Sequence, residues 1–237
     1  MHLVVTSDTA RPNGRWHRRG TRRSFRLARV DGKDTLTAIF GTAPGSLSDL
    51  EVISQLGRGA DTVVYRVRRR GAEYTLKVLT SADAASLTAV RREAALLGSV
   101  GHPLLPRIFE VGQTTNGPYL ILEYIDGHPL SQALRHGRLD EPTAVRLAVD
   151  LAGPLAAAHR SGLVHRDVKP DNVIVEPTGV GRLIDFGLAA RGGAHDDRVA
   201  GTLLYSAPEQ TGMLKRPIDG RSDLYALGVL LYECVTG

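Results

Sequence analysis

The chain has 237 residues, and 42% of them are hydrophobic, which is enough to bury a core as one domain or as two lobes. A single cysteine, Cys234, excludes an internal disulfide and suits a reducing compartment. No apolar run approaches the roughly 20 residues that cross a bilayer, and the start of the chain lacks the pattern of a signal peptide. We therefore expect a cytoplasmic protein.

The formal net charge of +5 is concentrated at the start of the chain. Residues 1–48 hold nine basic and three acidic residues, whereas the rest of the chain holds 21 basic and 22 acidic residues. The charge of residues 49–237 therefore does not indicate a nucleic-acid-binding domain. The arginines of 1–48, followed by "GTAPGSLS", predict a flexible arm and linker with at most one short strand at 24–30. Contact of these arginines with nucleic acid or an acidic membrane remains the alternative to a plain leader.

The first half of the remaining chain has the pattern of strands. Three strands are expected within 50–79, where β-branched runs are interrupted by glycine-containing turns, one of them at Gly57–Gly59. Apolar residues at helical spacing within 86–100 predict a helix that ends at Gly98. Two more strands follow at 106–112 and 118–125. Together these elements predict a mostly antiparallel sheet with one inserted helix.

The second half has the pattern of helices. A short helix is expected at 131–137, with Ser131 as its N-cap. A long helix is expected over 141–162, with Pro142 in its first turn and a kink at Gly153–Pro154. The remaining expected elements are short strands at 172–175 and 181–186 and an apolar helix at 222–236.

Three features of the first half are candidates for ligand binding or catalysis. The Gly57-x-Gly59 turn lets backbone N–H groups approach a phosphate, because no Cβ intervenes, although such turns often have no ligand. Lys77 lies inside an apolar strand and needs a counter-charge or an exposed edge. Glu93 on the following helix is the obvious partner, and a surface pair with a neighbouring arginine is the alternative.

The second half adds "HRDVKPDN" at 165–172 and "LIDFGLA" at 183–189. Both segments concentrate charged residues between apolar runs, and burying unpaired charge is unfavourable. Asn172 and Asp185 offer the hard oxygen ligands that Mg²⁺ prefers. Each motif alone is weak, but their order and spacing together are specific.

With these motifs in place, the chain resembles the eukaryotic-type serine/threonine protein kinase family in its bacterial form. The resemblance covers residues 50–237 and includes "GT" at 201–202, "APE" at 207–209 and "SDLYALGVLLYE" from 222. It implies an α+β, two-lobed fold. We expect an N-lobe and hinge at 49–125, with an antiparallel sheet and one helix. A mostly helical and incomplete C-lobe is expected at 126–237.

The resemblance also implies roles for individual residues. Asp167 would orient the substrate hydroxyl, Lys169 would stabilise the γ-phosphoryl group, and Lys77, paired with Glu93, would hold the ATP phosphates. Asn172 and Asp185 would bind Mg²⁺. The other residues expected at the nucleotide are Leu56, Gly57, Arg58, Gly59, Val64, Glu123, Ile125 and Ile174, with Leu122 at the back of the pocket.

Other residues match structural positions of the family. A hydrophobic stack between the lobes would contain Leu97, Ile108, His165 and Phe186, so His165 is expected to be packed rather than catalytic. Asp223 would accept hydrogen bonds from the backbone of the "HRD" loop.

The sequence also departs from the family pattern. Asp61 and Thr62 stand at the tip of the glycine turn, and Thr75 replaces a small residue at the adenine. Residues 188–200 contain no Ser, Thr or Tyr, so Asp196 or Asp197 is a hypothetical substitute for a phosphate that would face Arg166. Glu209 is expected to be unpaired, and the chain is expected to be a fragment that opens a multidomain signalling protein.

The sequence therefore predicts transfer of phosphate from ATP, with Mg²⁺, to Ser or Thr of a protein substrate. The alternative is an ATP-binding pseudokinase or an inactive kinase fragment that serves as a regulatory module.

Overall fold

The computed structural model of this chain describes residues 47, 49–59, 61–187, 190–191 and 204–237. Several sequence predictions lie outside these residues. They are the arm up to residue 46, the strand at 24–30, the "GT" pair at 201–202 and the hypothesis for Asp196 and Asp197. The boundary at 48/49 also stays a prediction.

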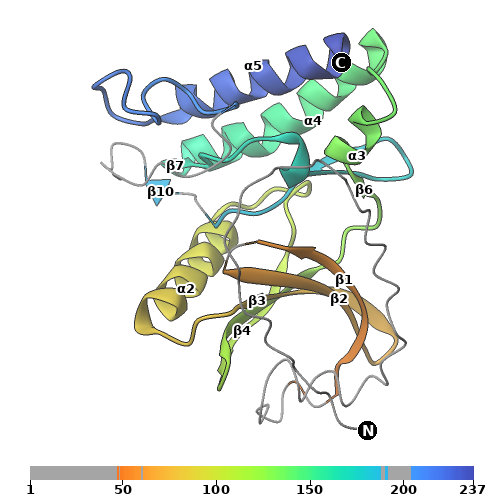
Figure 1. The fold of residues 1–237 in the computed structure, drawn as a ribbon, viewed down its shortest axis with the longest axis vertical. Helices are drawn as coiled ribbons and strands as arrows, with labels where there is room; N and C mark the ends of the chain where they lie inside the picture. Colours follow the sequence, from red (N-terminus) through yellow and green to blue (C-terminus); the bar gives the residue numbers. More distant parts are fainter. Residues whose placement is uncertain (1–46, 48, 60, 188–189, 192–203) are drawn as a thin grey trace, which may run out of the picture. The chain divides into compact units, whose positions relative to one another are not determined.

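The first described half of the chain forms a five-stranded antiparallel sheet with the strand order β1-β2-β3-β5-β4 (Figure 1). Its strands are β1 (Glu51–Arg58), β2 (Thr62–Arg69), β3 (Ala72–Leu79), β4 (Ile108–Thr114) and β5 (Gly117–Glu123). The predicted strands and the antiparallel arrangement are confirmed. Alternation along the strands decides which side chains share a face.

The outer face of the sheet has its own core. It consists of Leu47, Leu50, Val67, Leu76, Val78, Tyr119 and Ile121. Leu47 is completely buried there, so packing already involves a residue before β1. Asp49 adds an ion pair with Arg69, 3.0 Å from Oδ1 to Nε.

The inserted helix α2 (Ala84–Ser99) packs against β4 and β5. The Asp83 side chain caps it by accepting a hydrogen bond from the backbone N–H of Ser86. Val90, Glu93 and Leu97 are its buried residues, and they share one face because they are three or four positions apart. The helix was predicted correctly, and it extends one residue beyond Gly98.

The second half is mostly helical. Its elements are β6 (His128–Pro129), α3 (Leu130–Leu134), α4 (Glu141–Arg160), β7 (Leu163–Val164), η1 (Pro170–Asn172), β8 (Val173–Val175), β9 (Gly181–Leu183), β10 (Ala190–Arg191) and α5 (Gly220–Thr236). α4 and α5 contact each other, and their apolar faces form the main core together with β7 and β9. The predicted α+β fold with a sheet-rich first half is confirmed.

Two details of these helices differ from the predictions or refine them. Ser131 is wrong as an N-cap, since α3 begins at Leu130 directly after β6 and Pro129 is its N-cap. Among the described residues no side chain caps α3, and burial of the Leu130 side chain fixes the position of its first turn. α4 is one helix through Gly153–Pro154, and a Cβ on Gly153 would lie 3.1 Å from Nε2 of His102. Gly153 therefore permits the close approach of the loop that contains His102.

Candidate active site

A cavity of about 300 Å³ lies between the sheet and the segments around β8 and β9. Most of the predicted nucleotide-site residues line it, namely Leu56, Gly57, Val64, Lys77, Glu93, Glu123, Ile125, Asn172, Ile174 and Asp185. Leu122 and Thr75 line it as well. Arg58 and Gly59 do not line it, and Asp167 and Lys169 adjoin it through Asn172. The cavity thus unites residues that are more than 100 positions apart.

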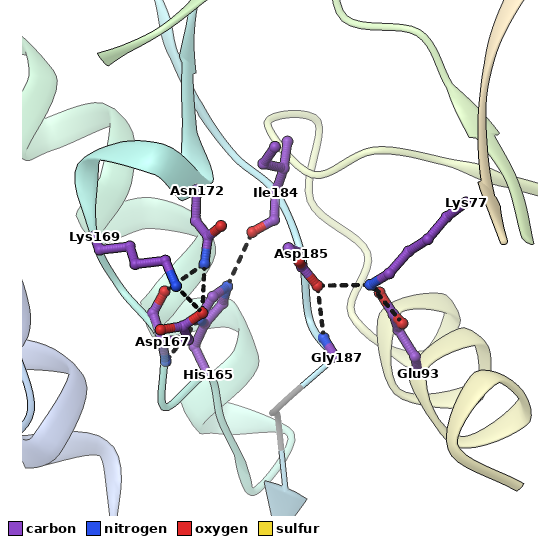
Figure 2. A network of polar contacts seen from close by, with 9 residues as sticks. All are labelled: Lys77, Glu93, His165, Asp167, Lys169, Asn172, Ile184, Asp185 and Gly187. Atoms are coloured by element: carbon purple, nitrogen blue, oxygen red, sulfur yellow. Dashed lines mark hydrogen bonds and ion pairs between the residues drawn. The ribbon is translucent and has the colours of Figure 1, made fainter. Parts of the chain in front are cut away.

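Lys77 lies on the cavity face because of the strand period. Leu76 and Val78 face the outer core, so Thr75 and Lys77 point to the opposite side. Lys77 Nζ lies 2.8 and 2.9 Å from the two carboxylate oxygens of Glu93 and 2.7 Å from Asp185 Oδ1 (Figure 2). The predicted pairing of Lys77 with Glu93 is therefore present, and Asp185 is a second partner.

The charges of this group depend on one another. Burial would lower the pKa of Lys77, but the carboxylates of Asp185 and Glu93 outweigh burial and raise it. Burial would raise the pKa of Asp185, but Lys77 outweighs it and holds that pKa low. In Glu93 burial prevails over Lys77, so its pKa is raised. Lys77 is thus a fixed positive charge in the cavity wall.

Asp167 is held from two sides within its loop. Lys169 Nζ lies 2.7 Å from Asp167 Oδ2, and Asn172 Nδ2 donates to the same oxygen at 2.8 Å and to the Asp167 carbonyl at 2.8 Å (Figure 2). The side chain of Asp167 is 12% exposed. Its carboxylate is therefore fixed in direction and keeps a small exposed area.

Asp223 at the start of α5 binds the backbone of this loop. Its two carboxylate oxygens accept hydrogen bonds from the backbone N–H groups of His165 and Arg166, both at 2.8 Å, as the resemblance implied. His159 Nε2 lies 2.7 Å from Asp223 Oδ2. Arg166 has a φ of 70°, which is unusual for a residue with a side chain, so these bonds hold a strained turn.

His165 is packed, as expected. It is completely buried, its ring meets that of Phe186 edge-on at 4.5 Å, and burial lowers its pKa. Leu97 and Phe186 are members of the main core cluster, and Ile108 packs against it. His165 therefore contributes to the packing between the lobes.

The prediction that Glu209 is unpaired is wrong. The hydroxyl of Ser222 donates to Glu209 Oε1 at 2.6 Å, and Arg216 Nη2 lies 3.5 Å from Glu209 Oε2. Burial would raise the pKa of Glu209, but the hydrogen bond from Ser222, aided by Arg216, holds it below its usual value. These partners are 7 and 13 residues away in the sequence, and only the turn into α5 brings them together.

The residues around Asp185 offer two oxygen donors for a metal ion. Asn172 uses its amide nitrogen for Asp167, and Figure 2 shows its amide oxygen pointing away from that residue. Within the described ranges no three His, Cys, Asp or Glu side chains form a metal-binding group. An amide and one carboxylate instead suit Mg²⁺, which keeps several waters and shares phosphate ligands.

Sequence reasoning missed Arg182. It lies in β9, is only 8% exposed, and donates to Glu123 at the end of β5. In the sequence it stands between Gly181 and Leu183 like any strand arginine, so no local signal marked it. Tyr124 and Pro106, which also line the cavity, were missed for the same reason.

The part of the chain that the structure describes contains no helix long and apolar enough to span a bilayer.

A family model described as protein kinase domain matches residues 50–237. The serine/threonine-protein kinase Pkn1 of Myxococcus xanthus is 38% identical over 88% of this chain, which corresponds to 31% of Pkn1. The probable serine/threonine-protein kinase CPE1738 of Clostridium perfringens is 34% identical over 79% of this chain and 28% of its own length. PknL of Mycobacterium tuberculosis is 36% identical over 78% of this chain and 49% of its own length. The chain thus spans about a quarter to a half of these relatives.

Proposed function

The chain belongs to the protein kinase family, and on that premise we propose that it transfers the γ-phosphoryl group of ATP to Ser or Thr hydroxyls of a protein substrate. The observation that carries this proposal is the arrangement at one end of the cavity. Lys77 of β3 pairs with Asp185, two residues after β9, and Asn172 of η1 binds Asp167 of the preceding loop (Figure 2). The backbone N–H of Ile184 donates to the Asn172 carbonyl at 2.8 Å, which places these two polar groups beside each other. Phosphoryl transfer depends mainly on such positioning and charge neutralisation.

In the proposed reaction each side chain has a separate task. Lys77, oriented by Glu93, would bind the phosphates that precede the transferred group. Asp167 would align the substrate hydroxyl and accept its proton as the new P–O bond forms and ADP leaves, because Lys169 and Asn172 fix its carboxylate. Lys169 would then balance the charge on the moving phosphoryl group. Mg²⁺, held by Asn172 and Asp185, would neutralise phosphate charge when bound.

The adenine is proposed to lie at the apolar end of the cavity. Val64 and Ile174 line it from the sheet and from β8, and the backbone at Glu123 and Ile125 forms its hinge wall. Leu122 is almost buried at the back. The charged and apolar ends of one cavity thus match the two ends of ATP.

The glycines of the β1–β2 turn add support. Neither Gly57 nor Gly59 has a positive φ. A Cβ on Gly57 would meet nothing within 4 Å, and one on Gly59 would meet only the Thr62 carbonyl oxygen at 3.9 Å. The fold itself does not require glycine at these positions, and a phosphate close to the backbone would.

A phosphotransfer assay with [γ-³²P]ATP, Mg²⁺ and casein tests the proposal. Asp167→Asn should reduce the transfer rate by about 100- to 10,000-fold, and it should still bind ATP. Glu141→Gln, which changes an exposed carboxylate in the first turn of α4, is the matched control and should keep full activity. A wild-type chain that binds ATP and transfers no phosphate would contradict the proposal and would favour a regulatory pseudokinase.

A further inference from the structure

Arg182 occupies an unusual position for an arginine. It lies in β9, three residues before Asp185, and is nearly buried. Its Nη1 donates to Glu123 Oε1 at 2.8 Å and its Nη2 to Glu123 Oε2 at 3.2 Å, which is the two-pronged geometry that a planar guanidinium makes with a carboxylate. Nη2 also donates to the carbonyl oxygen of Leu105 at 3.1 Å. Nη1 has a longer contact, 3.5 Å, with Glu176 Oε1 just after the adjacent strand β8. Beyond this neighbouring strand, one side chain therefore binds two separate segments.

The first of these segments is the hinge wall of the cavity. The Glu123 side chain is bound by Arg182 on one side and by the backbone N–H of Arg107 on the other, at 3.1 Å. The Glu123 backbone N–H donates to the Arg107 carbonyl at 2.8 Å. Because the proposed adenine contacts are backbone groups at Glu123 and Ile125, anything that fixes the Glu123 side chain also fixes this wall.

The second segment is the loop between α2 and β4. It contains Leu105, which is buried, and His102, which approaches Gly153 of α4. The loop follows directly from the helix that contains Glu93, the partner of Lys77. Arg182 thus lies where the hinge wall, the loop after α2 and the strand leading to Asp185 meet.

The guanidinium is not placed for stability alone. Its Nε is buried and has no hydrogen-bond partner among the described residues. A buried charge of this kind is often replaceable by an apolar side chain with little loss of stability. An arginine at this position makes physical sense if its directed hydrogen bonds to Glu123, Leu105 and Glu176 fix the geometry of the segments around it.

We propose that Arg182 is a positioning residue of the nucleotide site: by holding Glu123 and Leu105 together, it keeps the hinge wall in the arrangement that adenine nucleotide binds. The effect on nucleotide binding rests on the proposed function. The hydrogen-bonded connection of β9 to the hinge and to the α2–β4 loop does not. Arg182 touches no reacting atom, so its loss should act on nucleotide affinity more than on the transfer step.

The test compares four variants of the full chain. Arg182→Met removes the hydrogen bonds and keeps an unbranched side chain of similar length. Arg182→Lys keeps the positive charge but cannot form the two parallel hydrogen bonds of a guanidinium. Arg182→Met/Glu123→Gln also removes the carboxylate that the first variant leaves partly unpaired. Arg69→Met is the matched control, because Arg69 forms a comparable pair with Glu110 at 3.0 Å on the outer side of the sheet.

The first measurement is hydrogen–deuterium exchange of the nucleotide-free protein. Arg182→Met should speed amide exchange in segments 103–107 and 123–125 by about tenfold, and Arg182→Lys should restore part of the protection. Arg69→Met should leave both segments unchanged. Exchange in Arg182→Met that stays within about twofold of wild type would overturn the inference, since loss of a directed hydrogen bond to a charged group should exceed that.

The second measurement is binding of the fluorescent nucleotide mant-ADP, together with steady-state kinetics. Arg182→Met and the double variant should raise the mant-ADP Kd and the KM for ATP by about tenfold and change kcat far less. A general loss of folded protein would instead lower apparent kcat at constant KM and would contradict a positioning role. A wild-type chain that does not bind mant-ADP would refute the proposed function, and the exchange experiment would still decide on the tie made by Arg182.

Discussion

Lys77 Nζ lies between the carboxylates of Glu93 and Asp185, at 2.8 and 2.7 Å, so a single ammonium connects helix α2 to the segment after β9. The Glu93 side chain is 6% exposed, whereas that of Asp185 is 44% exposed toward the cavity. Glu93 therefore depends on Lys77 for its charge compensation, and Asp185 remains accessible to another partner.

This relationship predicts the outcome of removing the lysine. Lys77→Met should lower the free energy of unfolding by about 3 kcal/mol, because it leaves a buried carboxylate without its partner. The double variant Lys77→Met/Glu93→Gln should recover at least half of that loss, although neither variant should transfer phosphate. Urea unfolding followed by circular dichroism measures both effects. Equal stability of the single and double variants would show that Glu93 is not the group left uncompensated.

The glycine turn predicts opposite effects on stability and nucleotide binding. Gly57→Ala should leave stability unchanged or raise it by about 0.5 kcal/mol, because the backbone conformation suits any residue and the unfolded chain loses freedom. It should raise the KM for ATP by about tenfold if the phosphates approach this backbone. Binding and unfolding measurements on the same preparation test the two parts separately.

Gly71 supplies the control for this experiment. It lies in the turn between β2 and β3 with a φ of +82°. Gly71→Ala should therefore lower stability by about 1 kcal/mol without changing the KM for ATP. A result in which both alanine variants behave alike would refute the phosphate-approach explanation for Gly57.

Asp223 predicts a link between folding and activity. Asp223→Ala removes the acceptor of two backbone N–H groups and of His159, and should lower stability by about 3 kcal/mol. Because those N–H groups hold the strained turn at Arg166, the phosphotransfer rate should fall even at temperatures where the protein stays folded. Asp219→Ala removes the helix cap and the ion pair with the exposed Arg221 on the same element, away from the loop at Arg166. It should lower stability by about 1 kcal/mol, with normal activity.

Glu209 predicts a dependence of stability on pH. Its pKa in the folded chain is lower than the ordinary 4.5, so its contribution is fully present above that value. The contribution is lost as the pH falls through the folded pKa, because both states are then protonated. The stability difference between wild type and Glu209→Gln should therefore be constant near neutral pH and shrink as the pH falls below 4.5. Chemical unfolding at a series of pH values measures it, and a difference that grows in acid would contradict the assigned contacts.

The sequence by itself determined the elements whose signals are local. β-branched runs between glycine-containing turns placed the strands of the sheet, and helical spacing placed α2. The order of Gly57, Lys77, Glu93, Asp167 and Asp185 identified the family. Strand period then explains why Lys77 and Thr75 face the cavity while Leu76 and Val78 face the outer core. The strands, the helix and the facing of Lys77 follow from neighbours a few residues apart, and the family follows from the order of short motifs along the chain.

Only the tertiary structure decided the long-range polar partners. Ser222 and Arg216 pair with Glu209, Asp185 is a second partner of Lys77, and Arg182 binds Glu123 from 59 residues away. Composition and periodicity show that a buried charge needs a partner, because desolvation is unfavourable. They do not show which partner, since that depends on where the packing of whole helices and strands places each side chain.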